Sequence, residues 1–254
     1  MNTLFRKDLA LWWRTSTTYV CGSALLITCG YFFFTYANSY QQQVEQYRAG
    51  FLSEGALPSM RHIVVEPYLE TVGFLLVALV PLFFLRIQNE ERGRGVSSFL
   101  YTLPLSTGGL VVGRFFAALL TLSTLMFLVV IPIFTLLFLT KLSLFIGVVG
   151  FIGLVLVSAL YLAIGFLGMH LFGSPISLTL VHATVLFGLY FLPALGYQFG
   201  GEVGNVIEGL SPVTYTEEIF RGYLSFAQIL FFVTTTVVFL GMSGFLTHES
   251  RERA

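Results

Sequence analysis

The chain has 254 residues, of which 56% are hydrophobic and only 10% are charged. Soluble domains carry roughly 25% charged residues, so this composition excludes an ordinary soluble domain and indicates a polytopic membrane protein. The formal net charge is zero, which argues against a nucleic-acid partner because no basic excess is present to neutralise phosphates.

Residues 1–16 precede the first long apolar segment and mix apolar and aromatic side chains with basic ones. Trp12 and Trp13 lie near the end of this stretch, and Arg6 and Lys7 lie near its middle. Tryptophan is enriched at the level of lipid headgroups, where basic side chains also meet lipid phosphates. We therefore expect an amphipathic helix that lies on the membrane surface.

Six long apolar segments follow. We expect membrane spans near residues 19–37, 67–85, 110–139, 144–171, 176–197 and 226–246. A helix needs about 20 apolar residues to cross the hydrocarbon core. The first apolar segment is longer than the apolar part of a typical signal peptide, so we expect no cleavable signal. No long linker interrupts the chain, and the sequence predicts one all-α transmembrane domain over residues 1–254.

The basic residues are distributed unevenly over the segments between these spans. If both ends of the chain lie on one side, nine basic residues lie on that side and four on the other. The four are Arg48, Arg61, Lys141 and Arg221. Because cytoplasmic segments carry the excess of Lys and Arg, we predict a multi-pass protein of the inner (plasma) membrane with both termini in the cytoplasm.

Residues 86–109 form the longest basic segment between two spans. After an acidic and basic cluster, apolar residues recur at helical spacing from Val96 to Leu103, and Pro104 ends the run. This pattern predicts a short amphipathic helix at the cytoplasmic surface, suited to docking a soluble partner. The alternative is a solvated loop with a helix that merely lies on the surface.

The motifs of this segment resemble the permease subunits of ABC transporters of the type-2 exporter class, especially the gliding-motility and multicopper-maturation branch. That branch has E-E-R-x-x-G, then L-x-x-x-P-[LV]-S, then G-K-[FY]. The matching stretches here are residues 90–95, 100–106 and 113–115, with Arg114 in place of the lysine. The family usually has T-x-E-x-L after the glycine, whereas residues 96–100, VSSFL, lack the acid.

The resemblance implies an exporter whose substrate is amphipathic or lipid-linked. In the lipid membrane the chain would pair with a second permease subunit, identical or homologous, and bind two copies of an ABC ATP-binding subunit. The residues that would couple to that subunit are Glu90, Glu91, Arg92, Gly95, Phe99, Leu103 and Pro104. The second and fifth spans would line the translocation path with aromatic side chains, namely Phe74, Phe83, Phe84, Phe187, Tyr190 and Phe191.

The chain carries no ATPase motif of its own. A P-loop requires a lysine directly after a glycine, but Lys7 follows Arg6 and Lys141 follows Thr140. We expect ATP and Mg²⁺ on the partner subunit, and we expect this chain to have no catalytic residue, cofactor or metal. The four histidines are scattered and lack the spacing of metal ligands.

Two alternatives to an exporter remain at this point, which makes three possibilities in all. Residues 241–244, GMSG, match the G-x-S-G pattern of an intramembrane protease, but such a serine needs a histidine from another span, and only His248 follows it. Small residues that pack a span explain the pattern better. The third possibility is a membrane anchor that does not transport and belongs to a larger complex.

Two polar residues lie within the expected spans, where charge is costly and often functional. Glu70 comes three residues after Pro67, and we expect it to be an interfacial acid that reaches water. His182 lies six residues into its span after the turn at Ser174-Pro175, and we expect a neutral, hydrogen-bonded packing role for it.

Overall fold

The computed structural model describes residues 6, 9–10, 13, 16–51, 58–93, 107–140 and 143–252. Every regular element in these ranges is helical. The elements are α2 (Ser16–Arg48), η1 (Arg61–Val65), α3 (Glu66–Gly93), α5 (Thr107–Leu139), α6 (Leu144–Leu171), α7 (Pro175–Phe199), α8 (Gly201–Gly209), α9 (Pro212–Phe220) and α10 (Phe226–Glu252).

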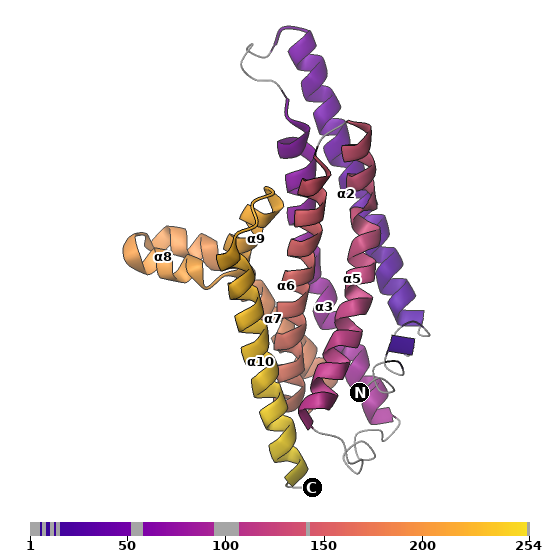
Figure 1. Ribbon diagram of the computed structural model, residues 1–254, viewed down its shortest axis with the longest axis vertical. Coiled ribbons are helices and arrows are strands. Elements are labelled where there is room, and N and C mark those ends of the chain that lie inside the picture. Colours follow the sequence, from indigo (N-terminus) through magenta and orange to yellow (C-terminus); the bar gives the residue numbers. More distant parts are fainter. Residues whose placement is uncertain are drawn as a thin grey trace.

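Six of these helical segments are long and apolar enough to cross a membrane. They are Thr18–Arg48, Arg61–Leu85, Val111–Leu139, Leu144–Leu171, Pro175–Phe199 and Phe226–Thr247. The prediction of an all-α, multi-pass membrane protein is therefore confirmed. The start of α2 and the end of α10 lie at the same end of the bundle, which is the lower end in Figure 1.

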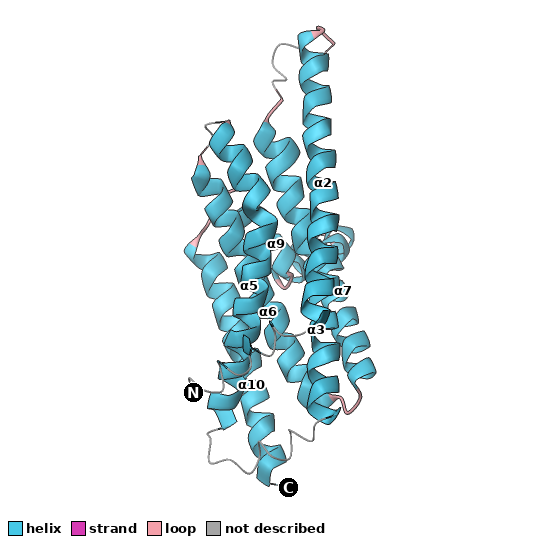
Figure 2. Cartoon of the chain, turned by 90° about the vertical axis from the view of Figure 1, so that its right-hand side faces the viewer, coloured by secondary structure: helices cyan, strands magenta, loops and turns pink. Residues whose placement is uncertain are grey.

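The first two helices extend beyond the expected spans. α2 continues through its glutamine-rich part to Arg48 because no glycine or proline interrupts it, and it projects above the rest of the bundle (Figure 2). It ends where Gly50 adopts a φ of 77°, while the Phe51 amide bonds to the Gln46 carbonyl. The second span begins at Arg61, since the π-helical turn η1 leads directly into α3 ahead of Pro67.

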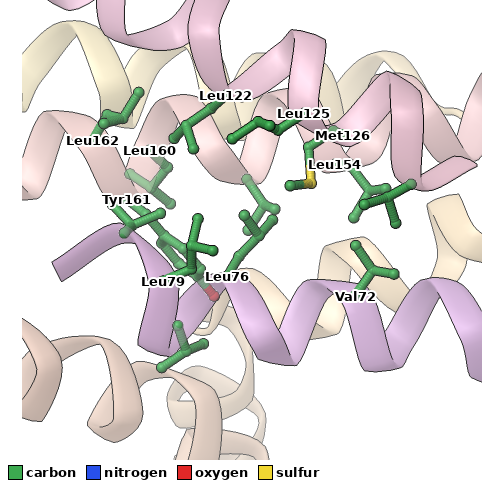
Figure 3. Close-up of a cluster of buried hydrophobic side chains, with 14 of the residues drawn as sticks. Val72, Leu76, Leu79, Leu122, Leu125, Met126, Leu154, Leu160, Tyr161 and Leu162 are labelled. Atoms are coloured by element: carbon green, nitrogen blue, oxygen red, sulfur yellow. The ribbon is translucent and has the colours of Figure 1, made fainter. Parts of the chain in front are cut away.

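The core lies between α3, α5 and α6 (Figure 3). Small residues on α6 let its neighbours approach closely: a Cβ at Gly150 would meet the Leu69 side chain, and one at Gly165 would meet Phe84. Close approach through small residues is the usual way in which helices pack in a membrane. The large buried side chains then interdigitate, for example Leu76 of α3, Met126 of α5 and Leu154 of α6.

The end of α7 and the whole of α8 project sideways from the bundle (Figure 1). Pro193 inside α7 removes a backbone hydrogen bond and favours a bend there. The turn between the two helices uses Gly200 and Gly201, with φ values of 61° and 59°. The pair then packs backbone to backbone, because a Cβ at Gly204 would lie 2.5 Å from the Gly196 carbonyl oxygen.

Replacing Gly204 with alanine should separate α8 from α7. The obstacle is a backbone oxygen that cannot rotate away, so the pair must open by an ångström or more, at a cost of about 1–3 kcal/mol. Hydrogen exchange of the α8 amides should rise tenfold or more. Gly209→Ala is the matched control because a Cβ there meets nothing within 4 Å. Unchanged exchange in Gly204→Ala would contradict the close packing.

Candidate functional site

A small, partly open cavity of about 50 Å³ lies where α3, α6, α7 and α9 meet. Carboxyl, hydroxyl and apolar groups line it. The lining residues are Glu70, Gly73, Val157, Tyr161, Tyr190, Val213, Thr216, Glu217 and Phe220. The cavity brings together residues that lie up to 150 positions apart in the chain.

Glu70 supplies one carboxylate of the cavity. It comes nine residues after the start of the second span at Arg61, which places it about 14 Å along the helix. Its side chain has no hydrogen-bond or ion-pair partner among the described residues, and it is only partly exposed. The sequence predicted an interfacial acid because the span was expected to begin at Pro67. The span begins six residues earlier, at Arg61, because η1 precedes α3, and Glu70 therefore lies deeper in the span than predicted.

Tyr161 and Tyr190 bring two phenol groups to the same cavity. Tyr161 is only 1% exposed, and its hydroxyl has no hydrogen-bond partner among the described residues. Its backbone carbonyl accepts a hydrogen bond of 3.0 Å from His182 Nε2, which holds α7 against α6. This bond and the burial of His182 confirm that the histidine has a hydrogen-bonded packing role.

Glu217 on α9 supplies the second carboxylate. Its nearest cation is Arg221, whose Nη2 lies 3.9 Å from Glu217 Oε2, and both side chains are about half exposed. A contact of this length and exposure contributes little to stability. The neighbouring Glu218 is occupied elsewhere because it accepts a hydrogen bond from Gln228 Nε2.

A tighter ion pair closes the start of α3. Arg61 Nε donates to Glu66 Oε1 and His62 Nδ1 donates to Glu66 Oε2, both at 2.9 Å. The Arg61 guanidinium also lies over the Tyr223 ring, 5.6 Å from its centroid. These contacts fix the first turn of the helix that carries Glu70 one turn further on. They also pair Arg61 with Glu66 through the guanidinium Nε.

Four of the six aromatic residues proposed for a translocation path lie together. Phe74 packs on Phe187 and Tyr190, with centroid distances of 6.1 and 4.9 Å, and Tyr190 packs on Phe191 at 5.3 Å. Phe74 and Glu70 are four residues apart on α3 and so share a face of that helix. We call these four residues the aromatic cluster; it adjoins the cavity through Tyr190.

The other two proposed path residues, Phe83 and Phe84, lie apart from this cluster. A helix turns 100° per residue, so positions nine and ten residues after Phe74 point in other directions. Both are buried in the core, and the Phe84 ring lies 5.2 Å from the rings of Phe166 and His182. In this conformation they pack the interior of the chain.

The predicted coupling residues lie mostly outside the described part of the structure. The backbone of Glu90, Glu91 and Arg92 belongs to the last turns of α3. Their side chains are not among those described, and neither are residues 94–106, which include Gly95, Phe99, Leu103 and Pro104. Most of residues 1–16, expected to lie on the membrane surface, are also outside the described ranges.

The serine of the G-x-S-G stretch lies in a packing contact. Ser243 is fully buried, and its hydroxyl donates to the Phe166 carbonyl oxygen at 3.2 Å. The nearby His170 pairs instead with the Thr247 hydroxyl, with Nε2 and Oγ1 3.0 Å apart. Within the described residues, no histidine is bonded to Ser243 as a base would be.

Sequence reasoning found only part of the cavity. It pointed to Glu70, an acid inside an apolar span, and to Tyr190, an aromatic residue of the expected path. It gave no site role to Tyr161, Thr216 or Glu217. In the described part of the chain, no three His, Cys, Asp or Glu side chains come close enough together to hold a metal ion. The chain matches no protein-family model and no curated protein.

Proposed function

We propose that this chain is the membrane-spanning permease subunit of an ABC exporter, acting as a dimer with two separate ATP-binding subunits. The observation that carries the proposal is the position of the E-E-R-x-x-G motif. α3 continues eight residues past the second span, from Leu85 to Gly93, and so carries Glu90 to Arg92 about 8–10 Å beyond it.

The motif lies at the end of the bundle that also holds the start of α2 and the end of α10 (Figure 1). By the positive-inside bias, this end faces the cytoplasm, where ATP-binding subunits would be found. The helices on either side of the segment, α3 and α5, both pack on α6. A force applied to residues 94–106 would therefore reach the core of the bundle through two helices.

The outer surface of the bundle also supports the proposal. Large apolar side chains are exposed along α2, α7 and α10, including Ile27, Leu180 and Val237. Such surfaces are covered by lipid or by a second membrane subunit. The exposed members of the aromatic cluster on α3 and α7 would then meet an amphipathic or lipid-linked substrate, either between subunits or from the lipid.

Replacing Phe99 with alanine should weaken the binding of the ATP-binding subunit. A buried aromatic anchor commonly contributes about 2 kcal/mol to an interface, which corresponds to a roughly thirtyfold loss of affinity. The measurement is the amount of P-loop ATPase that copurifies with the tagged chain from its native host. Phe116→Ala is the control, because Phe116 is an exposed aromatic residue in the membrane span of α5.

Failure to copurify any P-loop ATPase with the unaltered chain would refute the proposal. If an ATPase is retained, its turnover distinguishes a transporter from a membrane anchor. A transporter subunit should show ATP hydrolysis that responds to an amphipathic substrate, whereas an anchor should not. Equal retention by Phe99→Ala and the unaltered chain would mean that residues 86–109 form a passive loop.

A further inference from the structure

All the polar side chains that line the cavity between α3, α6, α7 and α9 carry oxygen and none carries nitrogen. Glu70 and Glu217 contribute carboxylates, and Tyr161, Tyr190 and Thr216 contribute hydroxyls. The Thr216 hydroxyl donates to the Val213 carbonyl at 3.0 Å, which leaves its oxygen free to accept. A set of acceptors with two carboxylates is suited to a cation or to a donor of several hydrogen bonds.

The charges around the cavity are not balanced. Of the nearby acids, Glu66 is paired with Arg61 and His62, and Glu218 is bonded to Gln228. The two acids that line the cavity are paired less well: Glu217 has only Arg221 at 3.9 Å, and Glu70 has no ion-pair partner within 4 Å among the described residues. An uncompensated carboxylate in a membrane span is costly, so a bound cation would stabilise this site.

Tyr161 gives independent support for a ligand. Its side chain is almost completely buried and lines the cavity, and its hydroxyl makes no hydrogen bond to another described residue. The hydroxyl is not among the enclosed unpaired atoms of the described residues, so it opens into the cavity, where a ligand or water can bond to it. Figure 3 shows this side chain reaching from α6 toward α3, the helix that carries Glu70.

The cavity is large enough for a small head group. Holding one water molecule needs about 10–15 Å³ of such space, and the cavity measures about 50 Å³. It therefore has room for a small cationic group such as a primary ammonium. A phosphate would be repelled by Glu70 and Glu217.

The aromatic cluster beside the cavity can bind an apolar tail. Phe74 and Phe191 are 37% and 53% exposed, and Tyr190 belongs both to this cluster and to the cavity lining. An amphiphile could thus place its head among the oxygens while its tail lies along these rings. The tyrosine rings would add cation–π attraction for an ammonium head.

We propose that this cavity binds the primary ammonium head of a cationic amphiphile, whose apolar tail lies on Phe74, Phe187 and Phe191. Binding by itself does not require an ATPase; only the statement that this amphiphile is the exported substrate rests on the proposed function. The proposal names a substrate class, a single-chain or lipid-like amine, for a chain otherwise expected to export amphipathic molecules.

Dodecylammonium chloride is the probe, added to the purified full-length chain in a neutral maltoside detergent. Its binding is measured by calorimetry and by the rise in thermal unfolding temperature. We expect saturable binding to the unaltered chain, at least a tenfold loss of affinity in Glu70→Gln, and a severalfold loss in Tyr161→Phe. Glu202→Gln, which removes an exposed acid on α8 far from the cavity lining, should bind as the unaltered chain does.

Matched probes separate the head from the tail. Dodecanol has the tail without the charge, dodecanoate has the same tail length with the opposite charge, and ammonium chloride has the head alone. The proposal would be overturned if dodecanol bound as tightly as dodecylammonium, or if Glu70→Gln bound dodecylammonium with unchanged affinity. It would also be overturned if ammonium chloride alone raised the unfolding temperature as much as dodecylammonium does. Glu70→Gln keeps the shape of the side chain and removes an unpaired charge, so this variant should remain folded, with an unfolding temperature no lower than normal.

The two proposals fail separately. If the chain binds dodecylammonium but copurifies no ATPase, the site stands and the exporter function does not. If an ATPase copurifies and no dodecylammonium binds, the exporter function stands and the cavity has no role in binding an amine.

Discussion

Replacing Gly165 with alanine is expected to lower the stability of the protein by about 3 kcal/mol, at the upper end of the range for overpacking a core. A Cβ at this position would lie 2.3 Å from Phe84 Cε2 and 2.6 Å from His182 Cε1. Neither ring can withdraw easily, because the Phe84 ring is fully buried against Phe166 and His182 is bonded to the Tyr161 carbonyl.

Thermal unfolding in detergent, or resistance to a denaturing detergent, measures this loss. Gly188→Ala on α7 is the matched control, because a Cβ at that position meets nothing within 4 Å. Alanine favours the helix over glycine by about 1 kcal/mol, so the control should be as stable as the unaltered chain or more so. If Gly165→Ala is as stable as the control Gly188→Ala, the close packing of α6 against α3 and α7 is wrong.

Replacing Glu66 with alanine should destabilise the start of the second span by about 2–3 kcal/mol. The Glu66 side chain is only 10% exposed and accepts hydrogen bonds from Arg61 and His62. Its loss leaves the partly buried guanidinium of Arg61 without its carboxylate, which costs more than the loss of a surface ion pair. The expected loss of stability is smaller than for a fully buried ion pair because the Arg61 side chain can reach water.

The experiment compares the unfolding temperatures of Glu66→Ala, Glu66→Gln and Glu45→Ala. The amide of glutamine can still accept a hydrogen bond from Arg61, so Glu66→Gln should lose about half as much stability. Glu45 is exposed on the projecting part of α2, and its removal should change stability by less than about 0.5 kcal/mol. Equal stability of all three variants would show that the pair contributes nothing.

Much of the architecture follows from local pattern. A long apolar segment must form a helix in lipid, because each backbone N–H and C=O group needs a partner within its own segment. This constraint acts on each segment separately, so the number of spans and the all-α class could be predicted from composition and length. The boundaries were less predictable: α2 continues to Arg48 and the second span begins at Arg61, because polar helix formers extend a helix without an apolar signal.

The candidate site depended on tertiary structure. Glu70 was visible as an acid within an apolar span and Tyr190 as an aromatic residue of the fifth span, but Tyr161 and Glu217 lie 91 and 147 residues further along the chain than Glu70. Nothing local to either residue marks it as part of a site, since a tyrosine in a span and an acid in a connecting helix are both ordinary. The folding of α9 against α3 and α6 brings the second carboxylate beside the first.

The aromatic residues illustrate the same division. The sequence by itself determined that the second and fifth spans are rich in phenylalanine and tyrosine, and that the chain is a six-span helical bundle. Only the packing of α3 on α7 and α6 decided which aromatic rings meet: Phe74 joins Phe187 and Tyr190, while Phe84 packs inward on Phe166 and His182. The reason is that lipid and protein interior are equally apolar, so hydrophobicity places a side chain in the membrane, whereas helix rotation and close packing choose its neighbours.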